Sequence, residues 1–151
     1  MKKIKNIILM LFVSLIFVSC ATAPLTGRRQ IKFVSDESVV QSSVAQYNQM
    51  IAQLRANNLL ANNTAQGKRV AQIGRRVTGA VEKYLRENGM ADKLQYLNWE
   101  FNLINTKDIN AFALPGGKIA FYSGILPVLQ TDGAIAFVMG HEIGHVIGGH
   151  H

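Results

Sequence analysis

Apolar residues recur three and four positions apart in two stretches of the first half of the chain, the spacing of one face of an α-helix. Ser35 and Thr64 stand just before these stretches, and both residue types favour helix N-caps. We therefore expect two amphipathic helices that face a core, with partner binding as the alternative for the first, and with Asn88-Gly89 ending the second. The apolar positions are Val40, Val44, Tyr47, Ile51 and Leu54 in the first helix, and Val70, Ile73, Val77, Val81 and Tyr84 in the second.

The apolar period changes to 2 after the second helix. Between residues 97 and 103, apolar side chains alternate with polar ones, which predicts a half-buried β-strand. A polar loop at 105–110 and a turn at Pro115-Gly116-Gly117 precede a second strand at 118–122. We expect these two strands to pair as neighbours in one sheet.

A last helix is predicted to begin near Thr131-Asp132, because both residue types suit a helix N-terminus. Helical spacing is kept to the end of this segment, through the apolar positions Ile135, Val138, Met139, Ile143 and Val146. The chain shows no internal repeat.

The first 19 residues are typical of a secretory signal peptide. Lysines precede an apolar run of 12 positions, 7–18, which is shorter than the roughly 20 apolar residues of a membrane-spanning helix. Residues 17–20, FVSC, resemble the lipobox of bacterial lipoproteins, although Phe17 stands where leucine is usual. This resemblance implies cleavage before Cys20, the only cysteine, and membrane anchoring through acyl chains such as palmitate. An ordinary secreted protein, cut near Ala21 or Ala23, is the alternative.

Charge argues against nucleic acid as a partner. The formal charge of +7 becomes +4 without the leader, because 13 basic and 9 acidic residues remain. Nucleic-acid binding would favour basic residues interleaved with aromatic ones, and this pattern is not found here. A solvated helix face is favoured over contact with lipid headgroups for the basic residues of the second helix, Arg69, Arg75, Arg76, Lys83 and Arg86.

Residues 141–145, HEIGH, carry the candidate chemistry. At about 100° per residue, His141 and His145 lie within roughly 40° of each other and about 6 Å apart along the helix. Both imidazoles can therefore approach one Zn2+ at about 2.0–2.1 Å. Glu142 lies one step round the helix, where a carboxylate can act as general base toward water. The alternative is a helix with two unrelated histidines.

Three blocks together resemble the HtpX-type, CAAX-prenyl-protease-like zinc metallopeptidases, in particular their periplasmic lipoprotein branch (BepA/LoiP-like). The blocks are residues 110–119 (NAFALPGGKI), 122–126 (YSGIL) and 141–145, and residues 26–30 (TGRRQ) also resemble that branch. The resemblance implies an α+β, zincin-like (gluzincin) domain with N-terminal helices, a small mixed sheet with an edge strand, and an active-site helix. Residues 1–19 would then be the signal peptide, 20–34 a tether and 35–151 the N-terminal part of the metallopeptidase domain.

The resemblance also assigns roles to residues. It implies that His141 and His145 bind zinc and that Glu142 is the catalytic base. The strand after the turn corresponds to the edge strand that holds an extended peptide through backbone hydrogen bonds. Its substrate-binding residues would be Gly117, Lys118, Ile119 and Ala120.

One departure concerns the third zinc ligand, which in the family is a glutamate on a later helix. The chain ends at His151, so we expect a truncated product that lacks this ligand. His151 also fits the metzincin spacing, but it would reach the metal only if the helix broke at Gly148-Gly149, and the same condition holds for His150.

These patterns predict a zinc endopeptidase that hydrolyses cell-envelope proteins in protein quality control. Cys20 would anchor it to the bacterial outer membrane, facing the periplasm. A non-catalytic lipoprotein that binds unfolded polypeptides is the rival hypothesis, and zinc content separates the two. A chain that does not fold alone is a third possibility, because its apolar faces would stay uncovered.

Overall fold

The computed structural model describes residues 20–22, 29–31 and 36–148. The leader, His150 and His151 lie outside the described residues, so the predictions for them stay predictions. The elements are β1 (Cys20–Thr22), β2 (Arg29–Ile31), α2 (Asp36–Ala56), α3 (Ala65–Glu87), the 3-10 helix η1 (Ala91–Tyr96), β3 (Glu100–Ile104), β4 (Ala111–Leu114), β5 (Lys118–Tyr122), the 3-10 helix η2 (Ser123–Ile125), α4 (Leu126–Leu129) and α5 (Asp132–Gly148).

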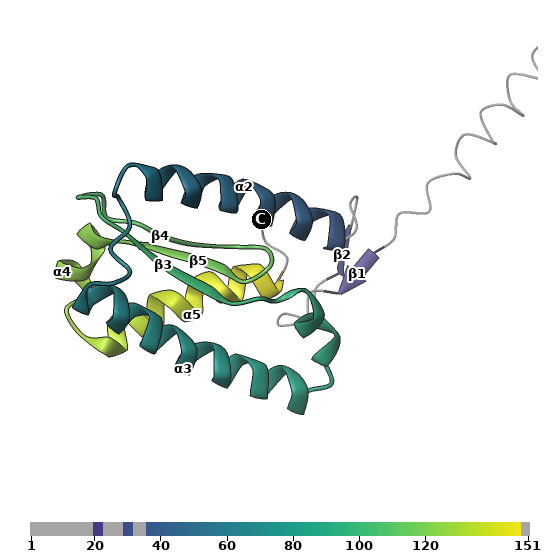
Figure 1. Ribbon diagram of the computed structural model, residues 1–151. Coiled ribbons are helices and arrows are strands. Elements are labelled where there is room, and N and C mark those ends of the chain that lie inside the picture. The colour runs from purple at the N-terminus through teal and green to yellow at the C-terminus, as the bar shows by residue number, and fades with distance from the viewer. Residues whose placement is uncertain (1–19, 23–28, 32–35, 149–151) are drawn as a thin grey trace, which may run out of the picture.

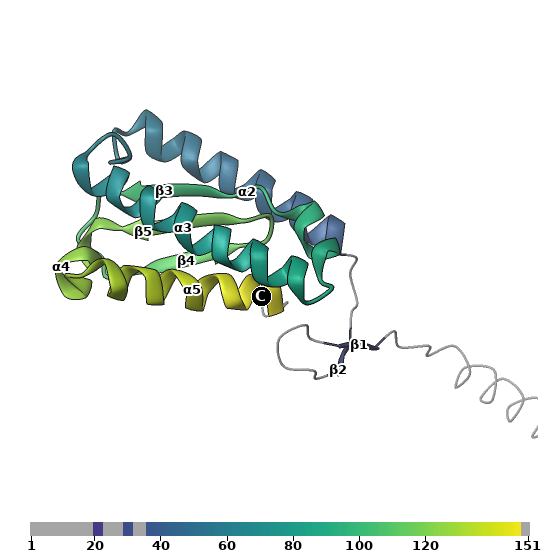
Figure 2. The ribbon, with the colours of Figure 1, turned by 90° about the horizontal axis from the view of Figure 1, so that it is seen from below.

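The main body has three layers, with one sheet between helices (Figures 1 and 2). The strand order is β3-β5-β4; β3 runs parallel to β5 and β4 runs antiparallel to it. Helix α2 covers one face of the sheet, and α3 and α5 lie side by side on the other. An α+β fold with a small mixed sheet, and the pairing of the two predicted strands, are confirmed.

The alternation of side chains along β5 divides the core in two. Ile119 and Phe121 are completely buried in the cluster that β5 shares with α3 and α5. Ala120, on the opposite face, belongs to a smaller cluster with Tyr47 and Ile51 of α2. Because β5 is covered on both faces, its three middle residues, Ile119, Ala120 and Phe121, are all apolar.

Capping hydrogen bonds explain where α3 and α5 begin. The Thr64 hydroxyl accepts a hydrogen bond from the Gly67 N–H at 3.1 Å, and Asn88 caps the end of α3, followed by Gly89 at φ +71°. At α5, the Thr131 hydroxyl accepts from the Ala134 N–H, also at 3.1 Å. The predicted starts of both helices are confirmed.

The sheet differs from the prediction in two ways. β3 begins at Glu100, three residues later than predicted, because the 3-10 helix η1 runs to Tyr96 and Leu97 caps it, donating its N–H to the Leu94 carbonyl. A third strand, β4, lies in the segment just before the predicted turn. It pairs with β5 through the turn at Gly116 and Gly117, both of which have positive φ.

The predicted position of residues Gly117, Lys118, Ile119 and Ala120 at an edge of the sheet is wrong. Residues 118–120 belong to β5, the central strand, which has a neighbour on each side. Their exposed fractions are 5% or less. Their backbone groups are therefore not available to a peptide substrate.

The predicted tether contains two short strands, β1 and β2, which pair antiparallel with Cys20 opposite Ile31. Across the part of the chain that the structure describes, no helix is both long and apolar enough to cross a membrane.

Candidate active site

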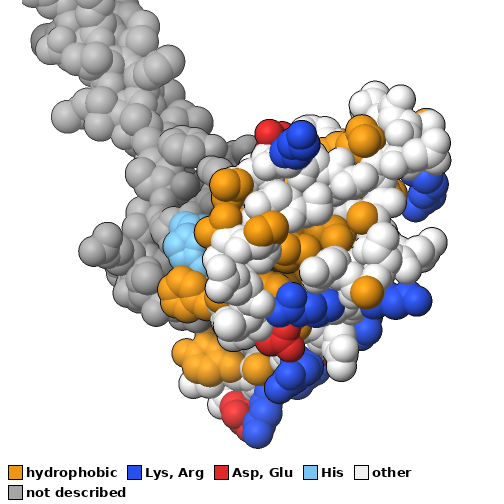
Figure 3. Space-filling model, turned by 90° about the vertical axis from the view of Figure 1, so that its left-hand side faces the viewer, with side chains coloured by type: hydrophobic (Ala, Val, Ile, Leu, Met, Phe, Trp, Pro, Cys, Tyr) orange, Lys and Arg blue, Asp and Glu red, His pale blue; other side chains and the backbone are white. Residues whose placement is uncertain are grey.

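Helix α5 is oriented by its buried residues. Ile135, Met139 and Ile143 recur every four residues and are at most 1% exposed. They pack against the sheet and α3, so the opposite side of α5 faces solvent. His141 and His145 lie on that exposed side, and Figure 3 shows the histidine surface next to hydrophobic side chains.

The two imidazoles converge as their spacing predicts. Their Nε2 atoms are 3.0 Å apart, the ring centroids are 4.6 Å apart, and the rings are nearly perpendicular at 88°. Two nitrogens that share one tetrahedral zinc ion at 2.0–2.1 Å would lie about 3.3 Å apart. The observed separation is close to this value, so the donor pair fits zinc with only a small adjustment of the rings.

The Glu142 carboxylate lies one residue further round α5, and its residue is partly buried. Among the described residues it makes no hydrogen bond or ion pair. A carboxylate that is partly shielded from solvent and not engaged elsewhere is free to exchange a proton with a water molecule beside the imidazole pair.

A complete metal site needs more than this pair. Within residues 20–22, 29–31 and 36–148, no group of three His, Cys, Asp or Glu side chains could hold a metal ion. Helix α5 is helical through Gly148, the last described residue, so the proposed break at Gly148-Gly149 and ligation by His151 lie at or beyond the described part.

β4, rather than β5, supplies the open edge of the sheet beside α5 (Figure 2). The Tyr122 N–H donates to the Asn110 carbonyl at 3.0 Å, and hydrogen-bonded pairs alternate along an antiparallel ladder. By this alternation, the backbone groups of Ala111 and Ala113 point away from β5. The Ala111 N–H is taken by the Asn110 side chain, which leaves Ala113 with both its N–H and C=O turned outward.

The opposite edge of the sheet is covered. Leu103 of β3 accepts a hydrogen bond from the Ala61 N–H at 2.8 Å and donates to the Asn62 side chain at 2.8 Å. The Asn105 N–H donates to the Leu59 carbonyl, also at 2.8 Å. Among the described strands of the main sheet, β4 is therefore the one that can accept a further strand.

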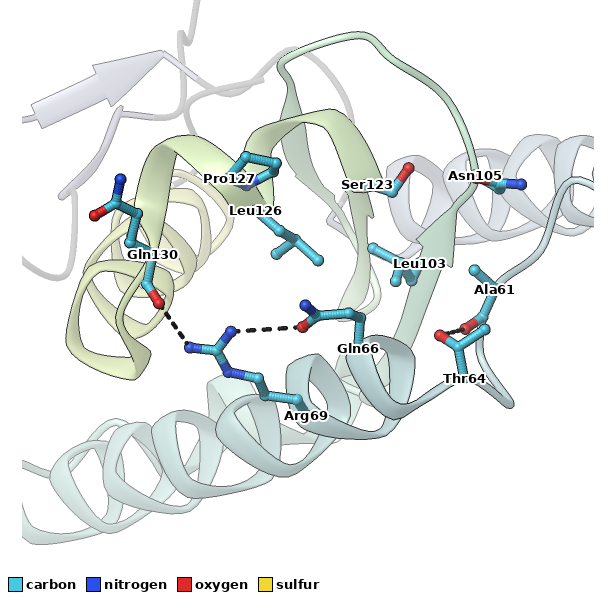
Figure 4. Close-up of a pocket in the computed structure, with 10 residues that line it drawn as sticks. All are labelled: Ala61, Thr64, Gln66, Arg69, Leu103, Asn105, Ser123, Leu126, Pro127 and Gln130. Carbon is cyan, nitrogen blue, oxygen red and sulfur yellow. Dashed lines mark hydrogen bonds between the residues drawn. The ribbon is translucent and has the colours of Figure 1, made fainter.

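A pocket of about 570 Å³ lies away from the histidine pair (Figure 4). Leu103 and Leu126 point into it, and at its floor Arg69 donates to the Gln130 carbonyl at 3.1 Å. Arg69 also pairs with Asp132 at the start of α5, 2.6 Å away. Nine residues, about 13 Å along the helix axis, separate Asp132 from the first histidine. The pocket is therefore not part of the candidate metal site.

An exposed imidazole pair one turn apart, a carboxylate beside it and an open strand edge alongside are the features of an HExxH-type metallopeptidase. The comparison with known families agrees: the chain belongs to Peptidase family M48, whose sequence profile matches residues 68–151. The family resemblance inferred from the sequence is thus confirmed.

Curated relatives of the chain include metalloproteases from bacteria and mitochondria. It is 27% identical to metalloprotease YcaL of Escherichia coli, over 90% of this chain and 54% of the relative. It is 36% identical to E. coli metalloprotease LoiP over 42% of this chain and 25% of LoiP. With the mitochondrial metalloendopeptidase OMA1 of Bos taurus it shares 26% identity over 91% of this chain and 25% of OMA1. The chain thus spans about a quarter of OMA1 and about half of YcaL.

Helical spacing predicts that His141 and His145 lie together, and the structure brings their imidazoles into contact. The open edge at Ala111 to Leu114 was not predicted from the sequence. Phe112 and Leu114 alternate with two alanines, which is a β-type signal, but four residues are too few to identify a strand by period.

Proposed function

We propose that the complete protein is a zinc-dependent endopeptidase that hydrolyses cell-envelope proteins in protein quality control. The observation that carries this proposal is the convergence of the His141 and His145 Nε2 atoms on the solvent side of α5, with Glu142 beside them. Membership of Peptidase family M48 and relatives named as metalloproteases support it.

In this mechanism His141 and His145 would hold the ion through their Nε2 atoms, and a further ligand would come from outside the described residues. When bound, zinc supplies Lewis-acid chemistry, polarising the scissile carbonyl and lowering the pKa of water. The Glu142 carboxylate takes a proton from the attacking water and passes it to the nitrogen of the leaving amine. The buried residues of α5 keep these three side chains in register.

The substrate backbone would add to the sheet at β4. The Ala113 N–H and C=O point outward from β5, so an extended peptide can form main-chain hydrogen bonds there. Because such bonds do not read side chains, we expect a broad range of unfolded or extended substrates.

Location in the cell envelope rests on the leader and on Cys20. We infer that Cys20 is acylated and anchors the protein to the outer membrane on its periplasmic side. Radiolabelled palmitate incorporation that disappears in Cys20→Ser would support this, and labelling that persists in the variant would contradict it.

Replacing the proposed base tests the activity. In the complete protein, Glu142→Gln should retain zinc but cleave an unfolded protein substrate at least roughly 100-fold more slowly, because a general base is lost. Zinc is measured by elemental analysis and cleavage by gel or fluorescence assay. Glu87→Gln, on the exposed surface of α3, is the matched control. Cleavage by Glu142→Gln at the wild-type rate would remove this residue from its role.

Replacing Ala113 tests the strand edge. Ala113→Pro removes the outward N–H and should raise KM for unfolded polypeptides by roughly 10-fold, about the worth of one main-chain hydrogen bond, with zinc content unchanged. Ala113→Gly keeps the N–H and is the control. Equal KM values in the two variants would mean that peptides do not pair with β4.

A non-catalytic role is the second candidate, and the open edge at β4 favours it independently of the metal. A protein of this kind would bind unfolded polypeptide without zinc and without cleaving it. Binding lost in Ala113→Pro, together with zinc-free protein and no effect of Glu142→Gln, would favour this function over hydrolysis.

A further inference from the structure

Helix α3 carries a row of cationic side chains along its outer side. At about 100° per residue, its five exposed Lys and Arg residues fall within an arc of about 100°, centred opposite Val70, which is buried, and Val77, which is half-buried. Its first and last members are 18 residues apart, or about 27 Å along the helix axis. We name it the α3 cationic row, and its members are Lys68, Arg75, Arg76, Lys83 and Arg86.

This row is a local concentration of charge, not the average of the molecule. Between Asp36 and Gly148, α3 holds six of the ten Lys and Arg residues but two of the nine Asp and Glu residues. The remainder of that stretch is therefore net acidic. Within residues 36–148, the excess of positive charge therefore lies on α3.

Most of the row is available to a partner. Lys68, Arg75 and Arg76 form no ion pair with a described residue. Lys83 and Arg86 each meet a glutamate four residues away at 3.8 Å, both on the surface. Exposed pairs of this length are weak and exchange readily for other anions. Arg69 lies outside the row and is committed to Asp132.

We propose that the α3 cationic row binds an anionic lipid surface. A straight row on the convex back of a helix fits a flat array of phosphate headgroups, each basic residue adding electrostatic attraction. Single-stranded nucleic acid is bound in basic grooves with aromatic residues for base stacking. The aromatic residue of α3, Tyr84, lies about 160° round the helix from Lys68, outside the row.

The contact has a consequence for orientation. α3 and α5 lie in the same layer, on the face of the sheet opposite α2 (Figures 1 and 2). A membrane contact through α3 would therefore place α5, the helix that carries the histidine pair, in the layer nearest the lipid surface. This interaction does not depend on zinc or on catalysis.

The test is binding to vesicles of defined charge. The mature protein, from residue 20 and with Cys20→Ser to prevent acylation, is mixed with phosphatidylcholine vesicles containing 0% or about 30% phosphatidylglycerol, at low salt. We expect binding to the anionic vesicles alone, and its loss in high salt. Lys68→Gln/Arg75→Gln/Arg76→Gln should weaken it on the order of 100-fold, as three cations are lost.

The matched control removes the same number of positive charges from positions outside α3. Arg55→Gln/Lys93→Gln/Lys107→Gln removes three cations outside α3 and should alter vesicle affinity by less than about 5-fold. Equal losses in the two triple variants would overturn the proposal, as would equal binding to uncharged vesicles. Row-dependent binding to single-stranded DNA or to an acidic polypeptide, without vesicle binding, would also overturn it.

Discussion

The two faces of the central sheet are built differently. The α3 and α5 face is a large apolar cluster around Phe121 and Met139, both completely buried. The α2 face has a smaller apolar cluster and a buried polar network beside it. Tyr47, Asn102 and Lys118 are 1%, 4% and 5% exposed and are all hydrogen-bonded. The face that carries the histidine helix is thus stabilised mainly by apolar packing, and the other face also by specific hydrogen bonds.

The network on the α2 face joins three elements. Asn102 of β3 donates to the Tyr47 hydroxyl and to the Glu100 carboxylate, each at 2.8 Å. The Tyr47 hydroxyl donates to the Ile119 carbonyl at 3.2 Å, and the Lys118 ammonium contacts Glu100 at 3.3 Å. Apolar packing tolerates small rearrangements, whereas such a network fixes one register of helix on sheet.

The largest loss of stability is expected from a substitution in the apolar face. Phe121→Ala should lower the free energy of unfolding by about 3–5 kcal/mol, because it leaves a cavity between the sheet and α5. Chemical denaturation measures the loss, and hydrogen exchange should show weakened protection in α5 more than in α2. Loss of protection centred on α2 would contradict the division between the two faces.

An intermediate effect is expected from the polar face. Asn102→Ala should cost about 2–3 kcal/mol, since the Asn62 amide, the Tyr47 hydroxyl and Glu100 lose a buried partner. Here hydrogen exchange should weaken first in α2. Asn63→Ala, at an exposed neighbour of Asn62, is the control and should change stability by less than about 0.5 kcal/mol.

The smallest effect is expected from Tyr47→Phe, and its dependence on pH tests whether the polar network is buried. At neutral pH it should cost about 1 kcal/mol for the lost hydroxyl contacts. Burial raises the pKa of Tyr47 from 10.0 to about 12, so folding favours the neutral phenol. That stabilisation is complete below pH 10 and is lost as pH rises through 12.

Denaturation of both proteins between pH 8 and about pH 12 measures this difference. Wild type should lose its advantage over Tyr47→Phe at the alkaline end, while Tyr84→Phe, at an exposed tyrosine, serves as the control. A constant difference across the range would show that Tyr47 is not shielded from solvent as the structure indicates.

The same contrast explains what the sequence could predict. The apolar face follows from periodicity: the stripes ending in Tyr84 and Val146 predict α3 and α5, and helical spacing alone brings His141 and His145 together. The network could not be predicted, because Tyr47 and Asn102 are 55 residues apart and meet only through packing. The edge assignment failed for a similar reason, since strand order depends on contacts that no local pattern records.

The segment around Ala61 covers the outer edge of β3, so the sheet has one open edge and one covered edge. A sheet with two open borders can lengthen in both directions and form fibres, whereas one with a single open border can take up only one further strand from each partner. Among the described strands of the main sheet, that border is β4. Capture of a client chain and pairing between two copies would therefore compete for the same row of peptide groups, so the protein's tendency to self-associate should fall when a client is bound.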